Sequence, residues 1–249
     1  MGGIYRNWAV QQYSGGGGSS NSTLLTGLIS YWKLDEFSDA SGPVSRIDSV
    51  TATGNDLTDN NTVPSAVGLI GNCGNFLTAN SEYLSTTSSS LILPGSARSL
   101  SLWWNLGTSL NMGIVCNGFS PNIGNPFLLI SYKVVGPKID VFDGGAYRNG
   151  TNLPGGTGGI GQWVHIVYTK STASDGVFYI NAVSNATWNA ADNDAGFPHG
   201  VLTLGSGFPT YATGQIDEVG LWNLVLTPVQ VTALYNGGLG ITYPFTGVP

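Results

Sequence analysis

Two neighbouring stretches near the end of the chain, Gly214-Gln-Ile-Asp-Glu-Val-Gly-Leu-Trp222 and Leu226-Thr-Pro-Val-Gln-Val-Thr-Ala-Leu-Tyr235, indicate its fold. The first is rich in β-branched and aromatic residues, which is typical of a strand. In the second, Thr227 precedes a proline, which is the order of a helix N-cap and a first helical residue. Gly237 and Gly238 then supply a helix stop. We therefore expect a strand that is followed closely by one short helix.

The strand pattern recurs through the rest of the chain. Short apolar runs alternate with turn signals, and several of these runs have a period of two residues. The runs cover residues 28–34, 100–104, 112–116, 127–132, 138–142, 163–169, 176–180, 201–204 and 216–222. Short strands with turn-rich connections predict an antiparallel sandwich or barrel. No internal repeat is apparent, which argues against a propeller or a solenoid.

Composition favours an all-β domain and excludes some classes of partner. Charged residues make up 9% of the 249 residues, 37 residues are glycine, and the net charge is −6. Such a composition suits short strands joined by many turns better than it suits helices. No basic patch is present, so neither nucleic acid nor an anionic membrane surface is an expected partner.

The cysteines and the N-terminus bear on the compartment. Cys73 and Cys116 both lie in apolar, strand-like runs, so we expect buried free thiols. The first eight residues, Met1-Gly-Gly-Ile-Tyr-Arg-Asn-Trp8, lack the apolar core of a signal peptide. No apolar run of about 18 residues is present. We therefore expect neither export by the general secretory route nor insertion into a membrane.

The chain divides into a head, a tether and one domain. Residues 1–14 mix aromatic and polar side chains, and residues 15–23 are a Gly/Ser-rich linker. A single domain of residues 24–249 follows. The head is either a disordered tail or a docking peptide, because Tyr5 and Trp8 are costly to leave in water.

Several short motifs follow one another through this domain. They are Gly27-Leu-Ile-Ser-Tyr-Trp-Lys-Leu-Asp-Glu36, Asp48-Ser49, Gly54-Asn-Asp56, Gly68-Leu-Ile-Gly-Asn-Cys-Gly-Asn-Phe76, Ser81-Glu-Tyr-Leu84, Ser99-Leu-Ser-Leu-Trp103, Gly161-Gln-Trp-Val-His165 and the closing strand and helix. In this order they resemble the laminin-G-like, concanavalin-A-like jelly-roll domains, which are close in shape to pentraxins. The resemblance implies an all-β, antiparallel two-sheet jelly-roll sandwich with one short C-terminal helix. One departure is Ala182, where the family's hairpin ordinarily has glycine because its two-residue turn needs positive φ.

Two histidines, His165 and His199, and three glutamates, Glu36, Glu82 and Glu218, are the candidates for catalysis. His165 lies inside a predicted strand, where a structural histidine is the simpler account, and His199 falls in a predicted loop. Concanavalin-A-like glucanases place two glutamates at strand spacing as nucleophile and acid, whereas no two glutamates are so paired here. We therefore expect that the chain is not an enzyme, with a glycoside hydrolase as an alternative.

Ca²⁺ is the cofactor that the resemblance implies, because laminin-G-like and pentraxin-like domains often hold it at a rim or between loops. Carboxylate and carbonyl oxygens are the ligands that Ca²⁺ prefers. Asp35, Asp48 and Asp217 lie in motifs that resemble the family's, and the first and last strands of this fold are neighbours. Asp192 and Asp194 form a second acidic cluster. The alternative is that these carboxylates are turn formers or are solvated.

Carbohydrate binding would use exposed aromatic rings that stack on sugars, together with amides and carboxylates that bond to hydroxyls. Among the aromatic residues of predicted loops, Tyr147, Trp188 and Tyr211 are the candidate glycan ligands. The tryptophans of the strand motifs are better explained by core packing.

Low charge and an aromatic head before a Gly/Ser tether favour a surface-exposed binding or decoration module of a phage virion, on the capsid or the tail. Residues 1–14 would bind a capsid or tail protein, and the domain would lie on the virion surface with a cell-surface glycan as its candidate ligand. The alternative is an extracellular domain of a bacterial adhesin. No coiled-coil signal is present, so a homo-oligomer is left open.

Overall fold

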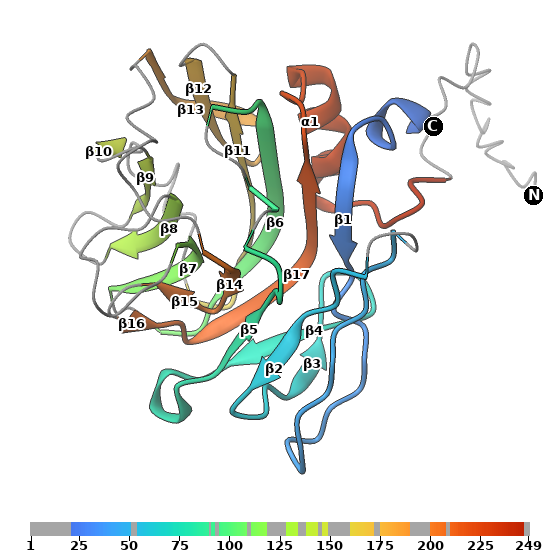
Figure 1. The fold of residues 1–249 in the computed structure, drawn as a ribbon, viewed down its shortest axis with the longest axis vertical. Coiled ribbons are helices and arrows are strands. Elements are labelled where there is room, and N and C mark those ends of the chain that lie inside the picture. The colour runs from blue at the N-terminus through green and yellow to red at the C-terminus, as the bar shows by residue number, and fades with distance from the viewer. Residues whose placement is uncertain are drawn as a thin grey trace, which may run out of the picture.

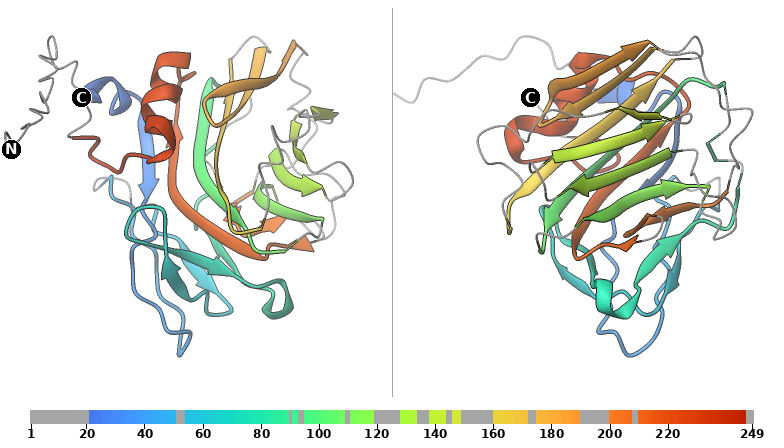
Figure 2. Two further views of the ribbon diagram at one scale, coloured as in Figure 1. Left: turned by 180° about the vertical axis from the view of Figure 1, so that it is seen from behind. Right: turned by 90° about the vertical axis from the view of Figure 1, so that its left-hand side faces the viewer.

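The computed structural model describes residues 21–246 apart from residues 51–53, 90, 93–94, 109–110, 119–127, 134–137, 144–145, 149–159, 172–174, 190–199 and 208–209. Two large antiparallel sheets face each other, and one helix packs outside them (Figures 1 and 2). The predicted all-β sandwich with one short C-terminal helix is thereby confirmed. No helix in this part of the chain is long and apolar enough to cross a membrane.

The larger sheet has the strand order β13-β12-β11-β6-β17-β4-β3, and β1 also pairs with β17. Its strands are β1 (Leu28–Trp32), β3 (Ser65–Val67), β4 (Asn72–Phe76), β6 (Arg98–Leu106), β11 (Trp163–Lys170), β12 (Asp175–Ile180), β13 (Val183–Asn189) and β17 (Gly214–Trp222). On one side, β17 pairs with β6 along most of its length. On the other side, the start of β17 pairs with β4 and its end pairs with β1.

The smaller sheet faces the larger one and has the order β10-β9-β8-β7-β14-β5-β2. Its strands are β2 (Thr58–Asn60), β5 (Tyr83–Ser85), β7 (Met112–Asn117), β8 (Leu128–Lys133), β9 (Lys138–Asp143), β10 (Ala146–Arg148) and β14 (Leu202–Leu204). A separate short ladder of β15 (Ser206–Gly207) and β16 (Thr210–Tyr211) packs against β7 of the smaller sheet. Each apolar run expected from the sequence overlaps one of the observed strands.

Side-chain alternation along the strands builds the main core between the sheets. On β6, Leu102 and Trp104 are buried in this core, and on β17 Ile216 and Leu221 are buried with them. Successive side chains of a strand point to opposite faces, so Trp103, between Leu102 and Trp104, points away from this core. Each large apolar side chain buried in this way contributes about 1.5–3 kcal/mol to folding.

A second core lies on the outer face of the larger sheet, beneath α1 (Pro228–Tyr235) and the segment that follows it. Tyr31, Trp222, Leu234 and Phe245 are buried together there. Thr227 is the N-cap of α1, as the sequence predicts, and it forms a reciprocal capping box with Gln230. Part of the larger sheet is therefore buried on both faces.

The folded domain begins before the predicted linker ends. Residues Asn21–Leu24 form a 3-10 helix, η1, and Leu24 is fully buried in the outer core. The indole N–H of Trp222 donates to the carbonyl oxygen of Leu24 at 2.7 Å. The predicted head, residues 1–14, and residues 15–20 of the linker lie outside the described residues.

Two places in the larger sheet hold non-glycine residues at positive φ. The β12–β13 hairpin turns through Asn181 and Ala182, whose φ values are 50° and 63°. Positive φ at both central residues defines a primed hairpin turn, so the turn keeps its type although alanine replaces glycine. The second place is Glu218, with φ of 50°, where the β17–β6 register shifts at a β-bulge.

Candidate functional site

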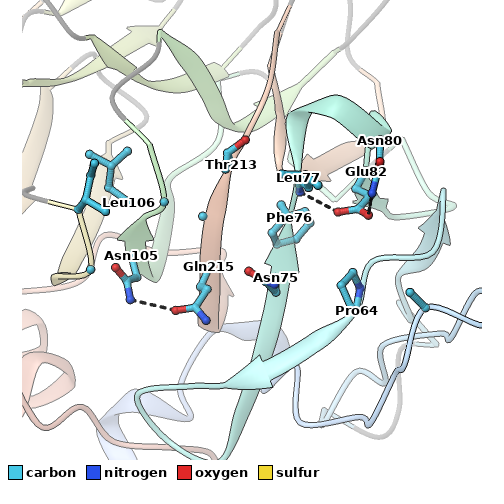
Figure 3. Close-up of a pocket in the computed structure, with 15 residues that line it drawn as sticks. Pro64, Asn75, Phe76, Leu77, Asn80, Glu82, Asn105, Leu106, Thr213 and Gln215 are labelled. Atoms are coloured by element: carbon cyan, nitrogen blue, oxygen red, sulfur yellow. Dashed lines mark hydrogen bonds between the residues drawn. The ribbon is translucent and has the colours of Figure 1, made fainter.

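A pocket of about 350 Å³ opens at the end of the larger sheet that α1 does not cover (Figure 3). Three amide side chains on adjacent strands form its floor, namely Asn75 of β4, Gln215 of β17 and Asn105 of β6. Gln215 is the register partner of both asparagines. We call these three residues the amide row, and it runs across the strands rather than along them.

The alternation of β6 and β17 explains why the amide row faces outward. Trp104 and Ile216, the sequence neighbours of Asn105 and Gln215, are buried in the main core. Because the next residue of a strand points to the opposite face, Asn105 and Gln215 lie on the outer face. The side-chain nitrogen of Asn105 donates to the side-chain oxygen of Gln215 at 2.9 Å (Figure 3).

One buried atom of the amide row has no hydrogen-bond partner among the described residues. The Oδ1 atom of Asn105 is buried and accepts no hydrogen bond within the described residues. A buried acceptor without a donor costs about 1–3 kcal/mol, so native proteins rarely leave one unmatched without a reason. A ligand that places a hydroxyl or an amide N–H beside Asn105 would recover that cost.

One wall of the pocket is built around Glu82, which is 2% exposed. Its carboxylate accepts from the backbone N–H of Leu77 at 2.7 Å and from the side-chain nitrogen of Asn80 at 2.8 Å. Both partners belong to the turn around η2 (Thr78–Asn80). Glu82 thus fixes the shape of this wall, and it is the one ionisable residue among the described residues that line the pocket.

The sequence analysis missed the amide row. The sequence contains only part of the information that would identify the amide row, since Asn105 and Gln215 are polar residues at outward positions of predicted strands. The sequence alone does not show that β4, β6 and β17, which are far apart in the chain, pair side by side. A polar residue on one outer strand position is ordinary, whereas three in register beside a pocket form a candidate site.

The three predicted metal ligands do not make up a metal-ligand group. Asp217 accepts from the backbone N–H groups of Leu69 and Ile70, and Asp35 accepts from that of Asn72, so both hold the same turn. Among the described residues, no three His, Cys, Asp or Glu side chains gather as metal ligands. Ca²⁺ therefore stays a prediction that these carboxylates, as they lie, do not support.

The third predicted ligand, Asp48, has a separate task. One of its oxygens accepts from the backbone N–H groups of Tyr31 and Val50, at 2.9 and 3.0 Å. It joins the loop before β2 to β1. The other predicted acidic cluster, Asp192 and Asp194, lies outside the described residues.

The predicted glycan ligands are not brought together. Tyr211 lies in β16 and its ring packs against Tyr83 at a centroid distance of 6.1 Å. Trp188 lies in β13 instead of a loop, and its indole N–H donates to the buried Asp143. Tyr147 lies in β10, and its side chain is outside the described part of the chain. The glycan role of these residues stays a prediction.

Asp143 is the centre of a buried ionic cluster between the two sheets. Lys170 lies 2.6 Å from one carboxylate oxygen, and Arg98 lies 3.4 Å from the other. The hydroxyl of Tyr168 donates to the same carboxylate at 2.9 Å. With these partners and Trp188 around it, the carboxylate joins β9 to β6, β11 and β13.

His165 is buried on the outer face of the larger sheet, beneath α1. Its Nε2 atom lies 2.9 Å from the hydroxyl oxygen of Ser101, and its ring lies against Trp103 and Tyr235. Burial lowers the pKa of His165 to about 3, so the imidazole is neutral at physiological pH. His199 lies outside the described residues.

Two adjacent carboxyl groups are buried at the bulge of β17. Burial raises the pKa of Asp217 to about 7 and that of Glu218 to about 8, and each group is further raised by nearby carboxylates. The hydroxyl of Tyr31 donates to Glu218 and lowers its pKa in part. The pair lies under the C-terminal segment, because Tyr31 also donates to the carbonyl oxygen of Ile241.

Comparison with known proteins gives a family and a fold. A family model described as the concanavalin A-like lectin/glucanases superfamily, Laminin_G_3, matches residues 78–232. No curated protein matches the chain. Among solved structures, domain 4 of a GH43 extracellular arabinanase from Geobacillus stearothermophilus, in complex with arabinotriose, is similar with a TM-score of 0.58 and 21% identity. The match covers 86% of this chain and 98% of that one.

A second group of similar structures is the sialidase of Trypanosoma rangeli. The complex with the inhibitor DANA has a TM-score of 0.62 and 13% identity, and the match covers 86% of this chain. This chain spans only 34% of the sialidase chain. The likeness is therefore one of fold, between this chain and a part of that enzyme.

These structures contradict the prediction that the chain is not an enzyme. That prediction rested on the missing glutamate pair of one glucanase template, whereas the same fold occurs in chains named as an arabinanase and a sialidase. The absence of one motif was too narrow a basis, because a fold hosts many unrelated activities.

Proposed function

The chain belongs to the concanavalin A-like lectin/glucanases superfamily, and from this premise we propose that it binds carbohydrate in the pocket floored by the amide row. Side-chain amides offer one donor and one acceptor group in fixed positions, which matches the hydroxyls of sugars. The observation that carries the proposal is the buried Oδ1 atom of Asn105, which lacks a donor. A sugar hydroxyl would supply it.

The pocket also has the size and the surface of a small-molecule site. Its volume of about 350 Å³ is within the range of ligand pockets. Leu77 and Ile160 are exposed apolar residues that line it, and sugars present apolar C–H faces beside their hydroxyls. The arabinanase domain of the same fold was solved with arabinotriose, which is in keeping with the proposal.

The test is a glycan array followed by calorimetric titration of the oligosaccharides that bind. Gln215→Ala removes the central member of the amide row and is expected to weaken binding at least about tenfold, since losing a ligand-facing polar group costs about 1–3 kcal/mol. The matched control is Asn189→Ala, an exposed amide on the far edge of the same sheet, which should bind as the wild type does.

Three outcomes are informative. Binding that Gln215→Ala abolishes supports the site, whereas binding that both variants retain moves it elsewhere on the molecule. The absence of any glycan ligand contradicts the proposal. The bound oligosaccharides are also followed by chromatography for cleavage, and a parallel titration in EDTA tests the predicted dependence on Ca²⁺.

The biological setting is proposed from the sequence alone. Residues 1–14 bind a capsid or tail protein, and the domain is exposed on a virion surface; the alternative is an extracellular adhesin domain. Aromatic residues ahead of a Gly/Ser tract support a docking segment. A pull-down with the peptide of residues 1–14 against purified virion components tests it, and the absence of association contradicts it.

A further inference from the structure

The pocket contains one formal charge, and that charge is negative. Glu82 is the single ionisable residue among the described residues that line it. Its oxygens are already engaged by Leu77 and Asn80, which are neutral donors. No lysine or arginine neutralises the carboxylate from within the described lining, so a ligand in the pocket meets its field without a compensating cation.

Three of the described cations are paired with carboxylates outside the pocket. Arg98 and Lys170 both contact the buried Asp143, and Lys138 pairs with Asp140 on β9. The chain as a whole carries a net charge of −6. A ligand carboxylate or sulfate ordinarily requires arginine or lysine at its site, because an anion that loses its water must be paired.

The amide row is suited to the opposite kind of ligand. Neighbouring strands lie about 4.8 Å apart, so Asn75, Gln215 and Asn105 extend over roughly 10 Å across the sheet. In Figure 3 the oxygen of the Gln215 amide points toward Asn105 and its nitrogen lies on the side of Asn75. The row thus presents donors and acceptors in alternation, as a neutral polyhydroxylated chain does.

We infer that this pocket selects uncharged oligosaccharides and discriminates against sugars that carry carboxylate or sulfate groups. The inference rests on the proposed carbohydrate-binding function and adds the class of ligand. It also sets this pocket apart from any site that recognises its sugar through a charge. The bound oligosaccharide lies across β6, β17 and β4 and contacts the amide row, and the part of it that faces Glu82 carries no charged group.

The experiment compares matched pairs of oligosaccharides on the intact chain by calorimetry. Galactotriose is paired with trigalacturonic acid, and lactose is paired with sialyllactose. We expect each acidic member to bind at least about tenfold more weakly than its neutral partner, because like charges brought together at an interface are unfavourable. High salt should leave binding of the neutral members unchanged, since no ion pair is involved.

A charge-altering variant sharpens the test. Asn80→Lys places an ammonium beside Glu82, and we expect it to improve binding of the acidic members and to reduce the tenfold preference. Gln215→Ala should weaken both members of a pair, which assigns the measured binding to this pocket.

The outcomes separate the inference from the function on which it rests. If acidic members bind as well as or better than neutral ones and Gln215→Ala abolishes that binding, the pocket binds carbohydrate and the inference is wrong. If no member of either pair binds, and no other glycan does, the proposed function itself fails. A neutral preference that is lost in Asn80→Lys supports the inference.

Discussion

The outer face of β17 differs between its two ends. At the end that pairs with β1, Trp222 lies fully buried against Leu24 and Phe245. At the start, which pairs with β4, Gln215 lies partly exposed in the pocket. β6 shows the same division, with Trp103 under Tyr235 of the helix and Asn105 beyond it. We call these regions the covered half and the open half of the sheet.

The comparison shows that one sheet can serve two purposes along the same strands. The inner face is lined by the apolar side chains of the main core, except at the ionic cluster around Asp143. The outer face bears closely packed aromatic side chains where the helix and the C-terminal segment exclude water, and it bears the amide row where they do not. Stability should therefore reside in the covered half, and recognition should reside in the open half.

The largest expected difference follows from removing one side chain from each half. Trp222→Ala should lower the free energy of unfolding by about 3–5 kcal/mol, because a fully buried indole and its hydrogen bond to Leu24 are lost. Gln215→Ala, on the same strand, should lower it by at most about 1 kcal/mol. Urea denaturation measures both. Similar losses for the two variants would contradict the division.

A second prediction concerns how stability depends on pH through Asp217 and Glu218, the two buried carboxyl groups of the covered half. Because the folded-state pKa values of Asp217 and Glu218 are raised to about 7 and about 8, the folded state holds protons that the unfolded state releases. Their contribution to stability is complete below about pH 4 and is lost as the pH rises through 7 and 8. Each unit of raised pKa corresponds to about 1.4 kcal/mol, so stability should fall clearly as the pH rises through this range.

Urea titrations across this pH range measure that fall. Asp217→Asn and Glu218→Gln should each reduce the slope of stability against pH, since they remove a titrating group. Asp39→Asn is the control, because Asp39 is exposed and a hydrogen bond from Ser41 lowers its pKa, which places its titration below this range. A wild-type slope that all three variants share would show that the pair does not titrate as described.

The smallest expected effect is at the turn between β12 and β13, where Ala182 packs against the covered half. Its φ of 63° is unfavourable for alanine and favourable for glycine. Ala182→Gly should therefore raise the free energy of unfolding by about 0.5–1 kcal/mol. Ala186→Gly, in the strand that follows, should lower it by a similar amount. A loss at both positions would mean that the methyl contact of Ala182 outweighs its backbone strain.

The covered half could be predicted from the sequence to a large extent. The closing strand and the Thr227 cap lie close together in the chain, so local patterns predicted them and the structure confirms them. The residue that caps the end of the helix is Asn236, directly before the predicted glycine stop. The position of His165 inside a strand was also predicted, and it lies in β11. What the sequence did not show is that Glu218 sits at a bulge, since bulges depend on the pairing of distant strands.

The open half could not be predicted in the same way. The amide row joins strands that are distant in the chain, so no local pattern connects Asn75 with Asn105. The prediction instead selected aromatic residues of presumed loops, and Trp188 proved to be a strand residue turned toward Asp143. The proposed sugar-binding positions depend on which polar residues are left uncovered, and coverage is a property of the whole fold.

The arrangement of the chain ends has a practical consequence. Leu24 and Phe245, near the two ends of the described chain, both contact Trp222. Both ends of the described chain therefore lie on the helix side of the larger sheet, at the opposite end of β17 from the amide row. A surface that approaches the molecule from the helix side would leave the pocket open to ligands in solution.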